Sequence, residues 1–456
     1  MLLTVVKREL TDHVMSFRFS AIFVITVILM VISVLVSSSS YNRAIKEYPA
    51  RVEDFVNEDG KTNLEMVACL GGATVNRTPS PLAFCSGTGE RQLPNQAAMG
   101  VHGLTGFQRT EEIGEIFSGA STMDWAFVIA VVFSFGAGLL TYKSISGELS
   151  DGTLTLTLSQ PVPRGTVLLG KYIAALLALV AVFLVGMLLG LIVLQSIDGI
   201  QLRGDDWLKI GVFAFASVIY LSSFILIGLL CSVFARVPLV SAITFLFIWS
   251  GLVFIIPNLG GIIAGQVGGA RTPLQVHEAN ISIPDQLSLT PGMSADEVAS
   301  VKLRREQVRE RLLMEYLQSL TRQVDLGQDL ARISPASAFS FAAERITGGG
   351  MFRFEKFVSN ASHYREGLFQ AIIEADRHDP ASEHRYVPWV CGGNHFSRLS
   401  VDLGAAAQFR DALPSSLEGL SAAFWDILLL IMYNLIAFAL TFWRFARQDV
   451  APTPGV

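Results

Sequence analysis

The side chains best suited to chemistry lie in one stretch in the C-terminal part of the chain, HDPASEHRYVPWVCGGNHF. Its potential metal ligands are His378, His384, Cys391 and His395. Imidazole and thiolate groups are preferred ligands of Zn²⁺ and similar ions, but the spacing of these four residues matches no compact metal motif. The alternatives are a solvated polar loop and, for Cys391, a disulfide, and we predict these in place of a metal site.

The chain contains four cysteines. Cys231 lies in an apolar run and is best explained as a small buried side chain. Cys69, Cys85 and Cys391 lie in two long segments, 37–124 and 257–424, that are predicted to be extracytoplasmic, where cysteines can pair if the compartment is oxidising. We predict a disulfide between Cys69 and Cys85, with Cys391 bridging to either of them as the alternative.

Groups that could catalyse a reaction at membrane depth are missing from the apolar runs. An intramembrane enzyme would need paired aspartates, an HExxH motif or a serine with a base, and Asp124 and Asp426 lie only near the ends of such runs. No Gly-rich phosphate-binding loop of the GxxxxGK[ST] type occurs, since Gly170-Lys171 is followed by Tyr172. The sequence therefore predicts a non-catalytic chain that binds no ATP or other cofactor, and an intramembrane enzyme remains an alternative.

The elements that surround these residues are apolar. The composition is 51% hydrophobic with a mean hydropathy of +0.48, which indicates a multi-span membrane protein. A helix needs about 20 apolar residues to cross the hydrocarbon core, and six stretches qualify. The predicted transmembrane helices are 19–36, 125–142, 172–195, 210–234, 239–256 and 425–443. The fold class that follows is an all-α polytopic membrane protein.

Lysines and arginines near the span ends predict the orientation, because short loops rich in them stay in the cytoplasm. They place both termini, the loop 143–171 and the tail 444–456 on the cytoplasmic side. The segments 37–124 and 257–424 then form extracytoplasmic domains, mainly helical with some strand possible. The net charge of −5 does not indicate binding to nucleic acid. The expected partner of the apolar surface is the lipid bilayer.

Residues 1–18 begin with an amphipathic stretch, MLLTVVKRELTDHVMS, and predict an interfacial helix. Its cations Lys7 and Arg8, together with Lys171 at the start of the third span, are predicted membrane anchors. In the second extracytoplasmic domain, Ser294 and Glu297 form a capping-box pattern that opens a long helix. The fifth span is predicted to stop at Pro257 and to enter a Gly-rich tail that is either re-entrant or a plain loop.

A short connector with an unusual sequence joins the second and third spans. It contains charged residues, threonines and leucines, and it reads SGELSDGTLTLTLSQPVPRGTVLLGKY. Its alternating leucines and threonines would suit a strand, but an isolated strand there would leave its edges unpaired. A short helix is predicted instead, with Leu154 and Leu158 on one face and with Pro161 and Pro163 ending it.

This connector resembles the signature of ABC type-2 permeases, the membrane subunits of ATP-driven exporters. The similarity rests on the DGTL run, the LS and PV pairs and the LLGK run, and KREL near the N-terminus resembles the family's interfacial helix. ISPASAF and YNL…FWRFARQDV resemble a subgroup with large outer domains, to which the permease of the nitrous-oxide-reductase maturation exporter is distantly similar. By this resemblance, the residues that couple to the ATPase are Glu148, Asp151, Gly152, Leu154, Leu158, Pro161 and Arg164.

The resemblance also implies partners. A separate cytoplasmic ATPase subunit would hold ATP and Mg²⁺, and a second permease subunit would complete a homodimer or heterodimer in the bacterial inner membrane. The expected function is export of a lipid, peptide, glycoconjugate or drug. The alternative within the same assembly is mechanotransmission, in which the outer domains are driven against a periplasmic accessory protein and no substrate is transported.

Overall fold

The computed structural model describes residues 2–52, 62–63, 73–91, 93–100, 103–108, 123–159, 162–197, 199–384, 397, 400–401, 409 and 411–448. Within them, six helices are long and apolar enough to cross a membrane, which confirms the predicted number of spans. They are Phe17–Lys46, Trp125–Ser150, Arg164–Gln195, Gly204–Phe234, Pro238–Val267 and Ser416–Ala446. The predicted all-α polytopic membrane fold is confirmed.

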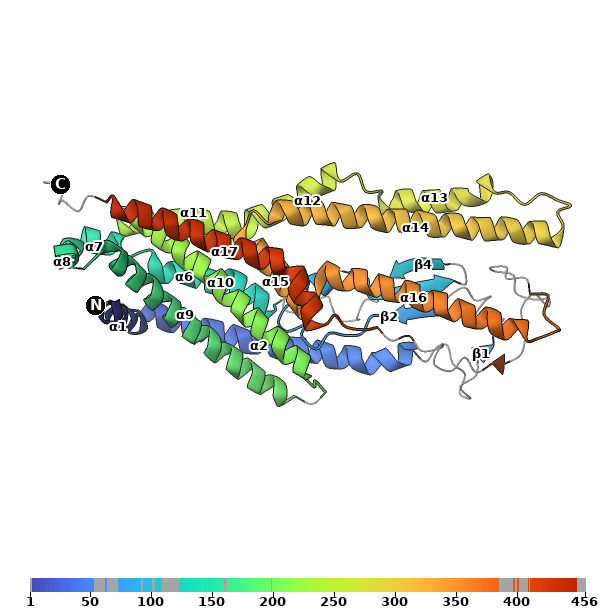
Figure 1. The fold of residues 1–456 in the computed structure, drawn as a ribbon, viewed down its shortest axis with the longest axis horizontal. Coiled ribbons are helices and arrows are strands. Elements are labelled where there is room, and N and C mark those ends of the chain that lie inside the picture. Colours follow the sequence, from blue (N-terminus) through green and yellow to red (C-terminus); the bar gives the residue numbers. More distant parts are fainter. Residues whose placement is uncertain are drawn as a thin grey trace.

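The molecule is elongated, with different elements at its two ends (Figure 1). One end, called here the terminal end, holds the short helices α1 (Leu2–Val14), α7 (Ser146–Ser150) and α8 (Thr153–Ser159) and the end of α17 (Ser416–Ala446). The other, called the domain end, holds the strands and the helices α13 (Pro273–Gln286), α14 (Ala295–Ala331) and α16 (Gly350–Arg377). The spans run between the two ends, so each one connects them mechanically.

Several spans are longer than their apolar runs. The first span belongs to α2 (Phe17–Val52), whose 36 residues extend about 54 Å at 1.5 Å per residue. The third and fourth spans are α9 (Arg164–Gln195) and α10 (Gly204–Phe234), of 32 and 31 residues. Because a hydrocarbon core is only about 30 Å thick, α2 continues well beyond it into the domain end.

The second span begins at the domain end with α5 (Trp125–Phe127). It continues through a π-helical segment, η3 (Val128–Phe133), into α6 (Ser134–Thr141). Asp124 caps its start by accepting a hydrogen bond from the backbone N–H of Phe127. A second π-helical segment lies in the fifth span.

The helix of the fifth span does not stop at Pro257, and the Gly-rich stretch after it is helical. The chain passes from α11 (Pro238–Ser250) through a π-helical segment, η4 (Gly251–Ile255), into α12 (Ile256–Val267), with no re-entrant turn. Pro257 lies in the first turn of α12, directly after the π-helical segment. Within that segment the carbonyl oxygen of Leu252 accepts a hydrogen bond from Ser334 Oγ. The proline is therefore accommodated inside a continuous helix.

The domain end combines a small sheet with long helices. Strands β2 (Ala73–Asn76), β3 (Gln96–Gly100) and β4 (Gly103–Gln108) form an antiparallel sheet in that order. The two-residue strands β1 (Thr62–Asn63) and β5 (Ser400–Val401) pair with each other, and α4 (Thr88–Arg91) is a single turn. Strands are thus present in both outer segments, although helix dominates.

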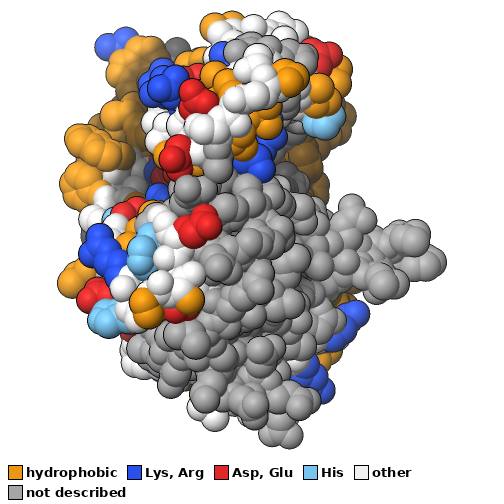
Figure 2. All heavy atoms as spheres, turned by 90° about the vertical axis from the view of Figure 1, so that its right-hand side faces the viewer, with side chains coloured by type: hydrophobic (Ala, Val, Ile, Leu, Met, Phe, Trp, Pro, Cys, Tyr) orange, Lys and Arg blue, Asp and Glu red, His pale blue; other side chains and the backbone are white. Residues whose placement is uncertain are grey.

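The long helix of the second outer segment begins as predicted. Ser294 and Glu297 form the reciprocal capping box at the start of α14, each side chain bonding the other residue's backbone N–H. Helix α14 packs against α12 through glycines, because a β-carbon at Gly260 would come within 2.5 Å of the Gly327 carbonyl oxygen. The loop between α13 and α14 lies at the tip of the domain end, where Figure 2 shows charged and apolar side chains interspersed.

Helix α15 (Pro335–Thr347) connects the outer helices to the span bundle. Its Phe339 is fully buried and stacks on Tyr220 of α10, with ring centroids 4.5 Å apart. A separate core lies in the domain end, where Phe354 and Phe357 of α16 pack with Phe409. Beside it, the buried Arg353 forms an ion pair with Asp411, whose carboxylate also accepts from the backbone N–H of Thr78. The first and second outer segments therefore fold together.

The cysteine predictions have different outcomes. Cys231 is a buried free thiol in α10, as expected of a small apolar side chain. Cys85 is also free and fully buried, in the same core cluster as Trp125, and burial raises the pKa of its thiol well above the ordinary range. This differs from the predicted disulfide with Cys69. Cys69 lies outside the described residues.

Candidate coupling site at the terminal end

The connector after the second span folds as two short helices, which corrects the single helix predicted for it. Helix α7 ends at Ser150, and α8 begins at Thr153. Between them Gly152 has φ of +72°, a left-handed conformation that glycine adopts without strain. The break at Asp151-Gly152 turns the chain sharply, so Glu148 and Leu154 lie on different helices.

A buried ion cluster holds α7 against two other helices. Lys171 of α9 is 2% exposed, and its Nζ donates to Glu9 Oε1 of α1 at 2.7 Å and to Glu148 Oε1 of α7 at 2.8 Å. Lys171 was predicted to anchor the span at the lipid headgroups, and instead it points inward. We call Glu9, Glu148 and Lys171 the terminal ion cluster. Pairing with two carboxylates offsets part of the cost of burying the ammonium group.

Helix α1 lies close against α9 because the crossing point carries a glycine. A β-carbon at Gly170 would come within 2.6 Å of the Val5 side chain. The cations Lys7 and Arg8 are exposed on α1, where a headgroup layer could reach them; their role as anchors remains a prediction.

The start of α7 is fastened to the fourth span. Ser232 Oγ, near the end of α10, accepts hydrogen bonds from the backbone N–H groups of Ile145 and Ser146 at 2.9 and 3.0 Å. A small apolar cluster surrounds this point, formed by Ile145, Leu154, Leu168, Val233 and Phe445. Leu154 therefore packs inward and fixes α8 to the bundle.

Arg164 binds the end of the sixth span. Its Nη1 donates to the carbonyl oxygens of Phe445, Ala446 and Gln448, at 3.3, 2.9 and 3.0 Å. These carbonyls lie at the C-terminus of α17, where they lack helical partners and where the helix dipole favours a cation. Arg164 thus links the connector to α17, a role that the sequence did not indicate.

Some of the predicted coupling residues are buried and others are exposed to solvent. Glu148 and Leu154 are internal and position the helices, whereas Asp151 and Gly152 are exposed. Pro161 and the side chain of Leu158 lie outside the described part of the structure. The prediction omitted Leu156, whose side chain is 69% exposed on α8. Its signal was present in the sequence, since on a helix the middle leucine of the run faces away from Leu154.

His13 of α1 lies beside the terminal ion cluster, and its Nε2 is buried without a partner among the described residues. Burial lowers the pKa of His13 from its ordinary value of 6.5; Lys171 lowers it too, while Glu9 and Asp12 oppose this. The folded protein therefore binds fewer protons at this site than the unfolded chain does just below pH 6.5, so stability falls as the pH falls through that window.

We expect the melting temperature of the purified protein to fall with pH below about 6.5, and His13→Gln to flatten this dependence. Thermal melts across the pH range, with His363→Gln on the exposed face of α16 as the control, measure the difference. An unchanged slope in His13→Gln would contradict the assignment.

The candidate metal ligands are not gathered in the part of the chain that is described. There, no group of three or more His, Cys, Asp or Glu residues is arranged to hold a metal ion. His378 Nδ1 lies 2.7 Å from the carbonyl oxygen of Glu374, and His384 Nδ1 lies 2.9 Å from Asp376. Cys391 and His395 lie outside the described residues.

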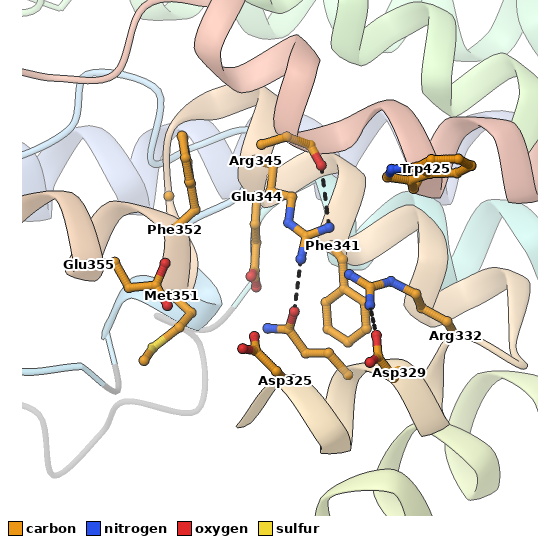
Figure 3. Close-up of a pocket in the computed structure, with 13 residues that line it drawn as sticks. Asp325, Asp329, Arg332, Phe341, Glu344, Arg345, Met351, Phe352, Glu355 and Trp425 are labelled. Atoms are coloured by element: carbon orange, nitrogen blue, oxygen red, sulfur yellow. Dashed lines mark hydrogen bonds and ion pairs between the residues drawn. The ribbon is translucent and has the colours of Figure 1, made fainter. Parts of the chain in front are cut away.

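A second charged cluster lies at the domain end, where the spans meet the outer helices. Asp426 of α17 is fully buried, and its carboxylate binds Arg345 of α15 and, at 2.6 Å, Arg332 at the end of α14. We call these three residues the domain ion cluster. Figure 3 shows both arginines on the wall of a pocket, with Arg345 also bonded to Gln328 and Arg332 to Asp329. The domain ion cluster thus joins three helices, as the terminal ion cluster does.

A comparison with family models matches residues 3–450 to the ABC-2 family transporter protein model. A comparison with curated proteins found no match. The matched range includes all six spans, the connector and both outer segments. Members of this family are typically non-catalytic membrane components of ABC transporters, working with a separate ATPase subunit. This chain, a multi-pass membrane protein, therefore belongs to the ABC-2 family of transporter proteins.

Proposed function

We propose that the chain is the permease subunit of an ATP-driven exporter in the bacterial inner membrane, with both termini in the cytoplasm. An ATPase subunit that binds ATP and Mg²⁺ docks on α7 and α8, and a second permease subunit completes the transport path. The observation that carries this proposal is the terminal ion cluster, in which Lys171 joins α1, α7 and α9 at distances of 2.7 and 2.8 Å.

The contacts that hold α7 suit a rigid element that transmits force to the spans. Force applied to α7 reaches the third span through Lys171, the fourth span through Ser232, and the sixth span through the neighbouring Arg164. A connector held at several points transmits a displacement, whereas a loosely held one absorbs it. The exposed surface of α7 and α8 around Asp151, Gly152 and Leu156 is left for the ATPase.

Leu156 supplies the test of this docking surface. Leu156→Asp is expected to weaken ATPase binding about tenfold, or about 1.4 kcal/mol, because an apolar side chain at the centre of an interface is replaced by a charge that must be desolvated. Co-purification of the ATPase subunit and the ATPase activity of the complex are the measurements. The expected result is a decrease in both with an unchanged melting temperature of the permease.

Leu289→Asp is the matched control, because Leu289 is also exposed but lies at the domain end. It should leave ATPase binding unchanged. If Leu156→Asp retains the ATPase at wild-type affinity, α8 is not the docking element and the proposal fails.

One observation favours mechanotransmission as a second candidate. Helix α2 continues from the membrane far into the domain end. Helix α12 packs closely on α14 through Gly260 and Gly327. Movements of the spans can therefore be transmitted directly to the outer helices. Proteoliposomes containing the complex separate the two functions. ATP-dependent movement of a substrate supports export, whereas ATP-dependent change in the outer helices without any such movement supports mechanotransmission.

A further inference from the structure

Two cavities adjoin along α14 and α16. The first has a volume of about 700 Å³ and includes the domain ion cluster's arginines in its wall; the second has about 910 Å³ and lies farther from the membrane. Met351 and Glu355 line both, so the two lie side by side. We call the combined space the α14–α16 trough. Both volumes lie in the range of ordinary ligand pockets.

The first cavity has an excess of carboxylates. It is lined by Asp325, Asp329, Glu344 and Glu355 against Arg332 and Arg345, and both arginines are bound to Asp426. Asp325 and Glu355 have no hydrogen bond or ion pair to other residues in the described ranges. Partial burial raises the pKa of Glu355, the Asp325 carboxylate raises it further, and Arg345 opposes them. A cation placed between these two carboxylates would relieve their repulsion.

The same cavity can also accept an anionic group. The side chains of Arg332 and Arg345 remain 18% and 20% exposed, so each guanidinium has donors near the cavity. Guanidinium groups match the geometry of phosphate oxygens. Phe341, Phe352 and Trp425 add aromatic faces around the cavity, and such faces attract ammonium groups (Figure 3). The cavity is therefore complementary to a zwitterion.

The second cavity is apolar. Its walls are leucine, methionine, valine and phenylalanine side chains, chiefly Leu313, Leu317, Leu320, Phe354 and Val358. A cavity of this kind gains free energy by burying a hydrocarbon chain. A zwitterionic cavity beside an apolar one fits an amphiphile whose headgroup and chain are adjacent.

The position of the trough points to the membrane as the source of its ligand. Trp425 lines the first cavity and is 67% exposed on α17, next to the exposed Phe424. Tryptophan favours the interface between headgroups and hydrocarbon. The exposed apolar face of α17 continues along the span, through Leu428, Ile431 and Leu435. A lipid can therefore reach the cavity from the adjacent leaflet.

We propose that the α14–α16 trough binds a phospholipid with a primary-amine headgroup, drawn from the outer leaflet, as a lipid ligand of the proposed exporter. The ammonium group lies between Asp325 and Glu355, the phosphate faces Arg332 and Arg345, and an acyl chain enters the apolar cavity. This inference rests on the proposed function for the orientation that makes this leaflet the outer one.

Photo-crosslinking in nanodiscs tests the proposal. The intact complex is reconstituted with phosphatidylethanolamine or phosphatidylglycerol of identical acyl chains, each carrying a diazirine near the chain end, and the cross-linked peptides are mapped by mass spectrometry. We expect phosphatidylethanolamine to label residues 313–324 of α14 and 351–358 of α16, and to do so about tenfold more than phosphatidylglycerol, a ratio equivalent to about 1.4 kcal/mol.

Two isosteric changes test the headgroup site. The double variant Asp325→Asn with Glu355→Gln should lower phosphatidylethanolamine labelling to the phosphatidylglycerol level. Glu315→Gln, an exposed position on the same helix, should leave it unchanged. Melting temperatures verify that both variants fold. For the apolar cavity, Leu317→Phe should reduce labelling by both lipids, because it fills the space that an acyl chain would occupy.

Equal labelling by the two lipids, or unchanged labelling in the double variant, would overturn the amine-headgroup assignment. Labelling confined to the lipid-facing sides of the spans would overturn the site itself. ATPase co-purification and turnover are measured on the same samples. Their loss would contradict the exporter, whereas normal turnover with failed labelling would contradict only the lipid site.

Discussion

Replacing Lys171 by methionine is expected to lower the free energy of unfolding by about 3–5 kcal/mol and to uncouple ATP hydrolysis from the spans. The ammonium is 2% exposed and neutralises Glu9 and Glu148 together. Without it, two carboxylates face each other beside an apolar bundle, and one oxygen of Glu148 already lacks a hydrogen-bond partner among the described residues. Denaturant unfolding of the permease and substrate-dependent ATPase activity of the complex measure the two effects.

The chain offers both a matched control and a rescue. Lys7→Met removes an exposed lysine from α1 and should change stability little, since exposed charges contribute little. The triple variant Glu9→Gln, Glu148→Gln and Lys171→Met should recover much of the lost stability, because no buried charge is left unpaired. If Lys171→Met unfolds at the wild-type denaturant concentration, the terminal ion cluster does not stabilise the junction.

The second large effect is expected at Asp426. Asp426→Asn should destabilise the protein by about 3–5 kcal/mol, because Arg332 and Arg345 would lose the buried carboxylate that they share. Both arginines are mostly buried, so water can replace only part of that interaction. The loosened junction should make α14 and α15 more accessible to protease at the domain end before the spans unfold. Limited proteolysis together with thermal melting measures this.

Asp329→Asn is the control for Asp426→Asn. Asp329 pairs with the same Arg332, but its side chain is mostly exposed, so its loss should cost little. Equal destabilisation by the two variants would show that burial of Asp426 is not the source of its contribution.

The two ion clusters lie at opposite ends of a connected set of helices. The sixth span, α17, is held at the domain end by Asp426 and at the terminal end by Arg164. Near its middle, Asn434 donates to Ser223 and accepts from Ser222, whose hydroxyl also bonds Tyr172 of α9 at 2.6 Å. Hydrogen bonds and ion pairs therefore link the connector, through Arg164 and α17, to the arginines that line the α14–α16 trough.

Several features of this protein were determined by local sequence alone. The six spans follow from apolar runs long enough to cross a bilayer, a property of each stretch that needs no partner. The start of α14 follows from Ser294 and Glu297, because a capping box is formed by residues three positions apart. The family was also evident from the connector, since its signature is a local run of residues, and the family match supports it.

Other features were decided only by tertiary structure. Whether Lys171 faces lipid or protein depends on Glu9, 162 residues away, and on Glu148 on a third helix. The helix continues past Pro257 through a π-helical segment, whose Leu252 carbonyl oxygen accepts a hydrogen bond from Ser334, 82 residues away. Asp426 is a core residue only because two arginines from the outer helices reach it. In each case the deciding contact joins distant segments, and for Lys171 and Asp426 it is a buried ion pair. No pattern within one segment records which partner will be close in the folded protein.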